Sequence, residues 1–115
     1  MARVRASLGG SGGGIDGVYY DEGTWSSAQD GVAIDLGFTP LTITFYNKNS
    51  SNLGITCTWS ASDSGYWTQA VSNATTRYSL GTSYSNYRPN IYAVSGTTVT
   101  LYGHNGCDYK LIATK

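Results

Sequence analysis

The chain has 115 residues, which suits one domain with a modest core. Charged residues make up only 12% of it, and seven Lys and Arg balance seven Asp and Glu, so the formal net charge is zero. A neutral chain has no electrostatic attraction to nucleic acid or anionic lipid, and no apolar run approaches the roughly 20 residues that cross a bilayer. We therefore expect no nucleic-acid binding and no membrane insertion, and the weak charge repulsion favours an oligomer.

Residues 1–14 differ in composition from the rest of the chain, because a basic start precedes the glycine-rich stretch 9–14. A disordered terminus is one interpretation. The alternative is an anchoring arm that binds a partner while the glycines act as a flexible linker. The anchoring side chains would be Arg3, Val4, Arg5 and Leu8. No apolar segment follows the arginines, so a secretory signal peptide is not expected and the protein should fold in a cytoplasm.

The folded domain is expected over residues 15–115, and from Gly17 onward the sequence predicts only strands and turns. Apolar and polar residues alternate with the period of two that is typical of half-buried strands. Clusters of Gly, Asn and Ser separate these segments and favour turns. The extended segments are 18–20, 23–25, 32–36, 41–47, 55–59, 66–71, 75–80, 91–94, 97–102 and 108–113.

Segment 41–47 is the clearest of these strands. Leu41, Ile43 and Phe45 are expected on one face, with threonines and a tyrosine on the other. Segment 55–59 repeats the pattern with threonines outward. The exterior is therefore predicted to be polar but uncharged, which is the main indication of function in this sequence.

Residues 66–80 contain neither Gly nor Pro, so a helix has to be considered. Their Tyr, Trp, Thr, Val, Asn and Ser side chains are poor helix formers. No apolar residue recurs every three or four positions, as it would on one side of an amphipathic helix. We therefore predict two strands here.

The last two segments are expected to form a hairpin around Asn105-Gly106. A two-residue turn would mix the buried and exposed faces. A three-residue loop, with Gly106 in the left-handed conformation, keeps the apolar side chains on one face, and register follows the buried face. The expected pairs are Leu101 with Tyr109 and Val99 with Leu111.

About eight strands at this spacing predict an all-β fold, a single antiparallel β-sandwich, with a jelly-roll-like arrangement as a close variant. Cys57 and Cys107 do not form a zinc-binding pattern. Without a secretion signal, two small buried thiols are favoured over a disulfide.

The order of several motifs is distinctive. An Arg-bearing start and a glycine linker precede a strand that ends in Leu36-Gly37-Phe38-Thr39-Pro40, and the chain closes with segments 94–99 and 109–113. From about Gly17 to Lys115 this order resembles small β-sandwich domains of bacteriophage virion proteins, especially tail-fibre and receptor-binding tips. The resemblance implies a non-enzymatic, trimeric protein on the tail or capsid surface of the virion, assembled in the cytoplasm of a host bacterium. The chain lacks a long fibre shaft, which favours a small tip or decoration protein held by its arm.

Groups for acid–base or metal chemistry are few. His104 lies in a predicted turn, and the adjacent Asp21 and Glu22 should point to opposite faces of a strand. A metal site at His104, Cys107 and Asp108 is a minor alternative. Gly9 to Gly14 do not follow a strand and open a helix, so they do not form a phosphate-binding loop. We therefore predict no enzyme activity and no cofactor.

Aromatic residues give a stronger indication, because Tyr and Trp offer rigid contact area while neighbouring Ser and Asn adapt their hydrogen bonds. Arg88 adds a bidentate donor. Such surfaces suit sugar rings, although Trp59 and several tyrosines are also expected to fill the core or a subunit interface. The candidate binding residues are Tyr66, Trp67, Tyr84, Tyr87, Arg88 and Tyr92.

Two functions from different classes follow. The first is a non-enzymatic virion surface protein, anchored to other virion subunits through its amino-terminal arm, whose loops contact a host-surface glycan or a neighbouring subunit. The second is a stand-alone carbohydrate-binding lectin of microbial origin. A small hydrolase is disfavoured by the shortage of acid–base groups.

Overall fold

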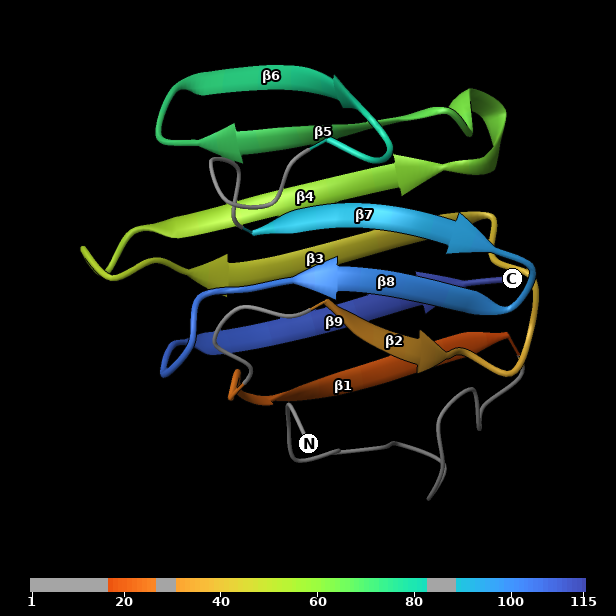
Figure 1. The fold of residues 1–115 in the computed structure, drawn as a ribbon, viewed down its shortest axis with the longest axis horizontal. Helices are drawn as coiled ribbons and strands as arrows, with labels where there is room; N and C mark the ends of the chain where they lie inside the picture. The colour runs from red at the N-terminus through yellow and green to blue at the C-terminus, as the bar shows by residue number, and fades with distance from the viewer. Residues whose placement is uncertain (1–16, 27–30, 83–88) are drawn as a thin grey trace.

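The computed structural model describes residues 17–26, 31–82 and 89–115, and these residues form two antiparallel β-sheets (Figure 1). The strands are β1 (Val18–Thr24), β2 (Val32–Asp35), β3 (Thr42–Lys48), β4 (Gly54–Ser60), β5 (Tyr66–Val71), β6 (Ala74–Ser79), β7 (Asn90–Ser95), β8 (Thr98–Tyr102) and β9 (Asp108–Thr114). A single 3₁₀ turn, η1 (Ala61–Asp63), is the one helical element of these residues, and no helix among them is long and apolar enough to span a bilayer.

The large sheet has six strands in the order β1-β9-β3-β4-β5-β6, and the small sheet has three in the order β2-β8-β7. Figure 1 shows the small sheet lying across the large one, with β6 and β1 at the two edges of the large sheet. The prediction of an all-β sandwich of two antiparallel sheets is confirmed, with nine strands in the described residues where about eight were expected.

The alternation of the sequence explains which side chains are buried. In β3, Ile43 and Phe45 point into the core, and β4 buries Ile55, Cys57 and Trp59 in the same way. The prediction for Leu41 is wrong, because its side chain is 57% exposed. Leu41 precedes the first paired residue of β3, so the alternation within the strand does not extend to it.

An aromatic cluster fills the core where β1, β3 and β9 lie side by side. Trp25 packs against Phe45 and Tyr109, each with a ring-centroid distance of 5.2 Å. Gly103 touches the Trp25 ring so closely that an added Cβ would lie 2.8 Å from it. Only glycine leaves room for the indole at this position.

The predicted pairing of the last two segments is wrong. β8 belongs to the small sheet and β9 to the large one, so the turn around Asn105-Gly106 carries the chain from one sheet to the other. Leu101 pairs with Val32 and Ile91, whereas Tyr109 pairs with Gly23 and Asn47. Periodicity predicted correctly that Leu101 and Tyr109 are buried, but they face one common core from opposite sheets. Gly106 has a φ of +83°, the left-handed conformation that was expected.

Asn47 holds this crossing turn in place. Its side chain is fully buried, one residue before the end of β3. The Oδ1 atom accepts a hydrogen bond from the His104 N–H at 2.7 Å, and Nδ2 donates to the Asp108 carbonyl at 2.9 Å. A buried polar side chain must find partners, and the Asn47 amide finds them in backbone groups of the turn that joins the two sheets.

The middle of the chain forms strands, as predicted. β5 and β6 pair regularly from Tyr66 with Ser79 to Val71 with Ala74. A two-residue loop joins them, and Ser72 in this loop has a φ of +54°. The hairpin forms one edge of the large sheet.

Both cysteines are free thiols, as predicted, although only Cys57 is fully buried. Its Sγ lies 3.3 Å from the Pro89 carbonyl oxygen, to which the thiol donates. Burial raises the pKa of the Cys57 thiol well above its ordinary value, because the charged thiolate loses its solvation. Cys107 lies in the crossing turn and is partly exposed.

Candidate binding surface

The most regular exposed surface is the outer face of the large sheet, defined here as the face turned away from the small sheet. Strand alternation places on it the residues that lie between the core residues. One row crosses all six strands and consists of Tyr20, Ile112, Thr44, Thr58, Thr68 and Arg77. The next row consists of Glu22, Lys110, Tyr46, Thr56, Ala70 and Thr75.

The centre of the outer face is neutral, and hydroxyl groups pair across its strands. Thr58 and Thr68 share a hydrogen bond of 2.5 Å between their Oγ1 atoms, and Thr42 and Thr114 share one of 2.6 Å. Neighbouring strands lie about 4.8 Å apart, so threonines in one row are held at a regular spacing. Each hydroxyl can both donate and accept, which leaves capacity for a further partner.

A shallow depression of about 420 Å³ lies on the outer face over β3, β4 and β5. Its volume falls within the roughly 300–1,000 Å³ that small-molecule sites occupy. Carbon atoms make up most of its exposed lining, and the polar groups among them come from Thr42, Thr44, Thr58, Ser60, Asp63, Tyr66 and Thr68.

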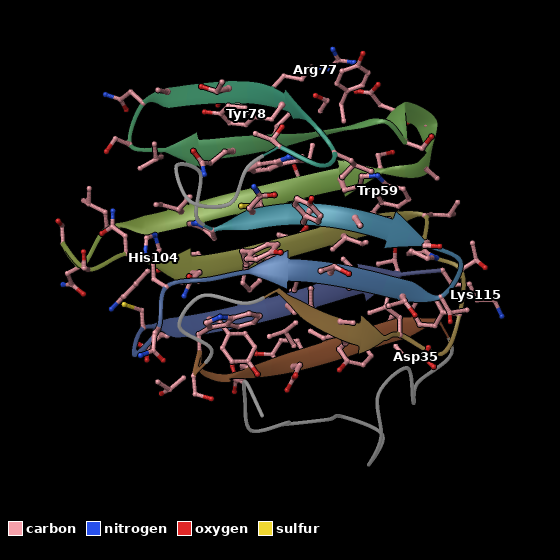
Figure 2. The ribbon with its side chains drawn as sticks, in the orientation of Figure 1. Asp35, Trp59, Arg77, Tyr78, His104 and Lys115 are labelled. Atoms are coloured by element: carbon pink, nitrogen blue, oxygen red, sulfur yellow. The ribbon has the colours of Figure 1, made fainter. Side chains whose placement is uncertain are left out.

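Tyr66 forms an aromatic wall of this depression, and Arg77 fixes the ring. The guanidinium carbon of Arg77 lies 3.6 Å from the Tyr66 ring centroid. Arg77 projects from β6 at the edge of the large sheet (Figure 2). Because Arg77 covers one face of the ring, the opposite face is the one that can line the depression.

Asp63 completes this arrangement from the turn that follows β4. Arg77 donates from Nη2 to Asp63 Oδ1 at 2.9 Å and from Nε to Oδ2 at 3.2 Å. The bond to Asp63 raises the pKa of the Arg77 guanidinium, so the group stays charged. The Ser60 hydroxyl accepts from the Ser62 N–H at 3.2 Å and caps the turn that carries Asp63.

The predicted binding residues do not form one site. Tyr66 is 40% exposed on the outer face, whereas Trp67 is 1% exposed and packs against Tyr78 at a centroid distance of 5.0 Å. The surface role predicted for Trp67 is therefore wrong, because consecutive strand residues face opposite sides. Trp59 is in the core, as expected.

Tyr92 lies in the small sheet, at the irregularity that interrupts the pairing of β7 with β8. Its half-buried ring meets Tyr102 edge to face at 5.2 Å. Tyr102 alternates with the buried Leu101, so this ring pair lies on the far side of the sandwich from Tyr66. The other candidate residues lie outside the described residues: Arg3, Val4, Arg5, Leu8, Tyr84, Tyr87 and Arg88.

The sequence alone did not predict Asp63, Arg77 and the threonine row as members of a site. The two Thr-x-Thr segments, Thr42 to Thr44 and Thr56 to Thr58, were a usable signal because both place two threonines on one strand face. No sequence pattern linked Asp63 to Arg77, which are 14 positions apart.

The acidic pair Asp21-Glu22 divides between the two faces, as predicted: Asp21 is buried and Glu22 is exposed. Glu22 accepts a hydrogen bond from the Tyr20 hydroxyl at 2.5 Å, which together with partial burial raises the pKa of Tyr20. Among the described residues there is no group of three or more His, Cys, Asp and Glu that could hold a metal ion.

Comparison with protein-family models, with curated proteins and with solved structures gives no match to this chain. The class of the protein is therefore defined by its own architecture, a two-sheet antiparallel β-sandwich. Its candidate function has to be argued from the outer face and its depression.

Proposed function

We propose that this protein is a non-enzymatic binding protein displayed on the surface of a bacteriophage particle, as a tail-fibre tip, a receptor-binding protein or a decoration protein. The outer face of the large sheet contacts a glycan on the host surface. Residues 1–14 attach the domain to other virion subunits, and the domains associate as trimers.

The observation that supports this proposal best is the chemistry of the outer face. A row of threonines crosses its centre, and the charged residues lie around this row, two pairs of them in the ion pairs Lys48–Asp108 and Asp63–Arg77 and the others at Glu22 and Lys110. Such a surface offers hydrogen bonds and ring contacts without long-range attraction to a charged polymer. A neutral polymer with many hydroxyl groups is the partner that matches it.

Immunoelectron microscopy of intact particles tests whether the protein lies on the particle surface. Antibodies raised against residues 15–115 should label particles of the phage that encodes the chain. Particles assembled with a chain that lacks residues 1–14 should lose the label, while the same antibodies still recognise the free truncated protein. Particles that carry no label with the full chain would refute the proposal.

A stand-alone lectin is the second candidate, and the depression beside Tyr66 is the observation that favours it. This site is built entirely from β3, β4, η1 and β5 and needs no contribution from residues 1–14. A lectin would bind its sugar equally well with and without those residues and would be absent from particles.

A further inference from the structure

We infer that the depression beside Tyr66 is a site for a neutral saccharide unit, held against the free face of the Tyr66 ring. This inference rests on the proposed binding function and specifies the part of the outer face that contacts the ligand. Its components come from three strands and one turn of the described structure.

The Tyr66 ring supplies a pre-oriented platform. A sugar ring presents C–H groups on one side, and these pack on a flat aromatic face. Arg77 lies over one face at 3.6 Å and is itself fixed by three hydrogen bonds to Asp63. The ring is thus held in position before a ligand arrives, so binding does not have to restrict its rotation.

Hydroxyl groups near the ring offer hydrogen bonds to a sugar. Thr58 and Thr68 already bond one another at 2.5 Å, which leaves each oxygen with acceptor capacity. Thr44 and Ser60 extend this polar wall toward β3 and the end of β4. These groups exchange donor and acceptor roles by rotating, as the mixed hydroxyls of a saccharide require.

Asp63 provides the strongest acceptor of the site. A carboxylate offers about four acceptor positions, and the Arg77 bonds do not use all of them. A sugar hydroxyl that donates to Asp63 would make a charge-assisted hydrogen bond. Because Arg77 balances the charge of Asp63, the site as a whole favours a neutral unit over an acidic one.

The openness of the depression limits its affinity. A shallow site leaves much of a ligand in contact with water, so we expect a dissociation constant on the order of 1 mM for a single sugar. An array of such domains on one particle would raise the overall avidity without any new contact.

Nuclear magnetic resonance of the full, isotopically labelled chain tests the site. Glucose, galactose, N-acetylglucosamine and rhamnose are each titrated to about 50 mM, well above the Kd of a weak site. We expect at least one of them to shift the amide signals of Thr44, Thr58 and Thr68 with a saturable dependence on concentration. Shifts confined to other surfaces, or no saturable shift with any of the four sugars, would overturn the inference.

Variants test whether the named side chains cause the saccharide-dependent shifts. Tyr66→Ala should weaken binding by about tenfold or more, and Thr58→Val by about threefold. Tyr20→Ala is the matched control, because Tyr20 lies on the same face in the opposite edge strand, and it should change the dissociation constant by less than about twofold. Equal effects of Tyr66→Ala and Tyr20→Ala would contradict the assignment.

These experiments distinguish a failure of the saccharide site from a failure of the proposed virion function. Particles that carry the protein while all four sugars leave its spectrum unchanged would keep the virion role and overturn this site. Saturable shifts in a protein absent from particles would keep the site and favour the stand-alone lectin.

Discussion

Tyr66 and Trp67 are consecutive in β5, yet Tyr66 is 40% exposed and Trp67 is 1% exposed. The two rings lie on opposite faces of the large sheet, because successive strand residues alternate. One ring forms a wall of the depression, and the other belongs to the core beside Tyr78. The boundary between the outer face and the core thus runs between two neighbouring aromatic residues.

Substitution of these two residues should have different consequences for stability. Trp67→Ala is expected to lower the free energy of unfolding by about 3–5 kcal/mol, because it leaves a large cavity in the core. Tyr66→Ala, which removes a partly exposed ring, should cost much less. Urea unfolding followed by circular dichroism measures both. Similar losses for the two variants would contradict the burial of Trp67 in the core and the exposure of Tyr66 on the outer face.

Asn47→Ala should destabilise the protein by about 2–4 kcal/mol, because it empties a fully buried position and removes two hydrogen bonds to the crossing turn. The groups affected are the His104 N–H and the Asp108 carbonyl. The matched control is Asn105→Ala, since Asn105 is an exposed residue of the same turn. Chemical unfolding of the two variants provides the comparison, and equal stability would contradict the role of Asn47.

Asp35 makes the stability depend on pH. Its Oδ1 accepts from the Gly37 N–H at 2.9 Å, and this bond, with one from the Thr97 side chain, lowers the pKa of Asp35. A carboxyl group whose pKa is lower in the folded state stabilises the fold at pH values above its unfolded-state pKa of about 3.9. This stabilisation is lost as the pH falls through the folded-state pKa. The melting temperature of the wild type should therefore decline more steeply in this acid range than that of Asp35→Asn.

Thermal melts at a series of pH values from neutral to acid test this expectation. The difference between the wild type and Asp35→Asn isolates one carboxylate from the others that titrate nearby. If the two curves remain parallel through the acid range, the hydrogen bonds to Asp35 do not contribute in the way described.

The two thiols should react at different rates with a disulfide reagent. Cys57 is buried and its pKa is raised, so it forms little thiolate and is inaccessible in the native state. Cys107 is partly exposed and should react first. Ellman's reagent should therefore detect one thiol in the native protein and two after unfolding without reductant. Detection of no thiol after unfolding would indicate a disulfide instead.

Periodicity alone predicted much of the fold. The alternation around Ile43 and Phe45 fixed the buried face of β3, and the lack of an apolar stripe in 66–80 excluded a helix. Alternation does not determine which strands are neighbours, so the partner of Leu101 was assigned incorrectly. The predicted burial of Leu41 was wrong for a local reason, because this residue lies just outside the strand.

The candidate site was less predictable than the fold. Tyr66 was identified from composition, but composition cannot tell which of two adjacent aromatic residues is buried. Arg77 and Asp63 meet only because the β5–β6 hairpin and the turn after β4 come together at one end of the sheet. Such contacts depend on tertiary structure, and no short sequence pattern encodes them.

The most direct test of the central claim, that the outer face of the large sheet is the recognition surface, is a cell-binding measurement on the full chain. Fluorescently labelled wild type, Thr58→Arg and Ala33→Arg are compared by flow cytometry on a panel of bacteria. Ala33 is exposed on the outside of the small sheet and serves as the control for an added arginine. We predict that Thr58→Arg abolishes binding and that Ala33→Arg preserves it. Loss of binding with Ala33→Arg but not with Thr58→Arg would place recognition on the opposite face and contradict the claim.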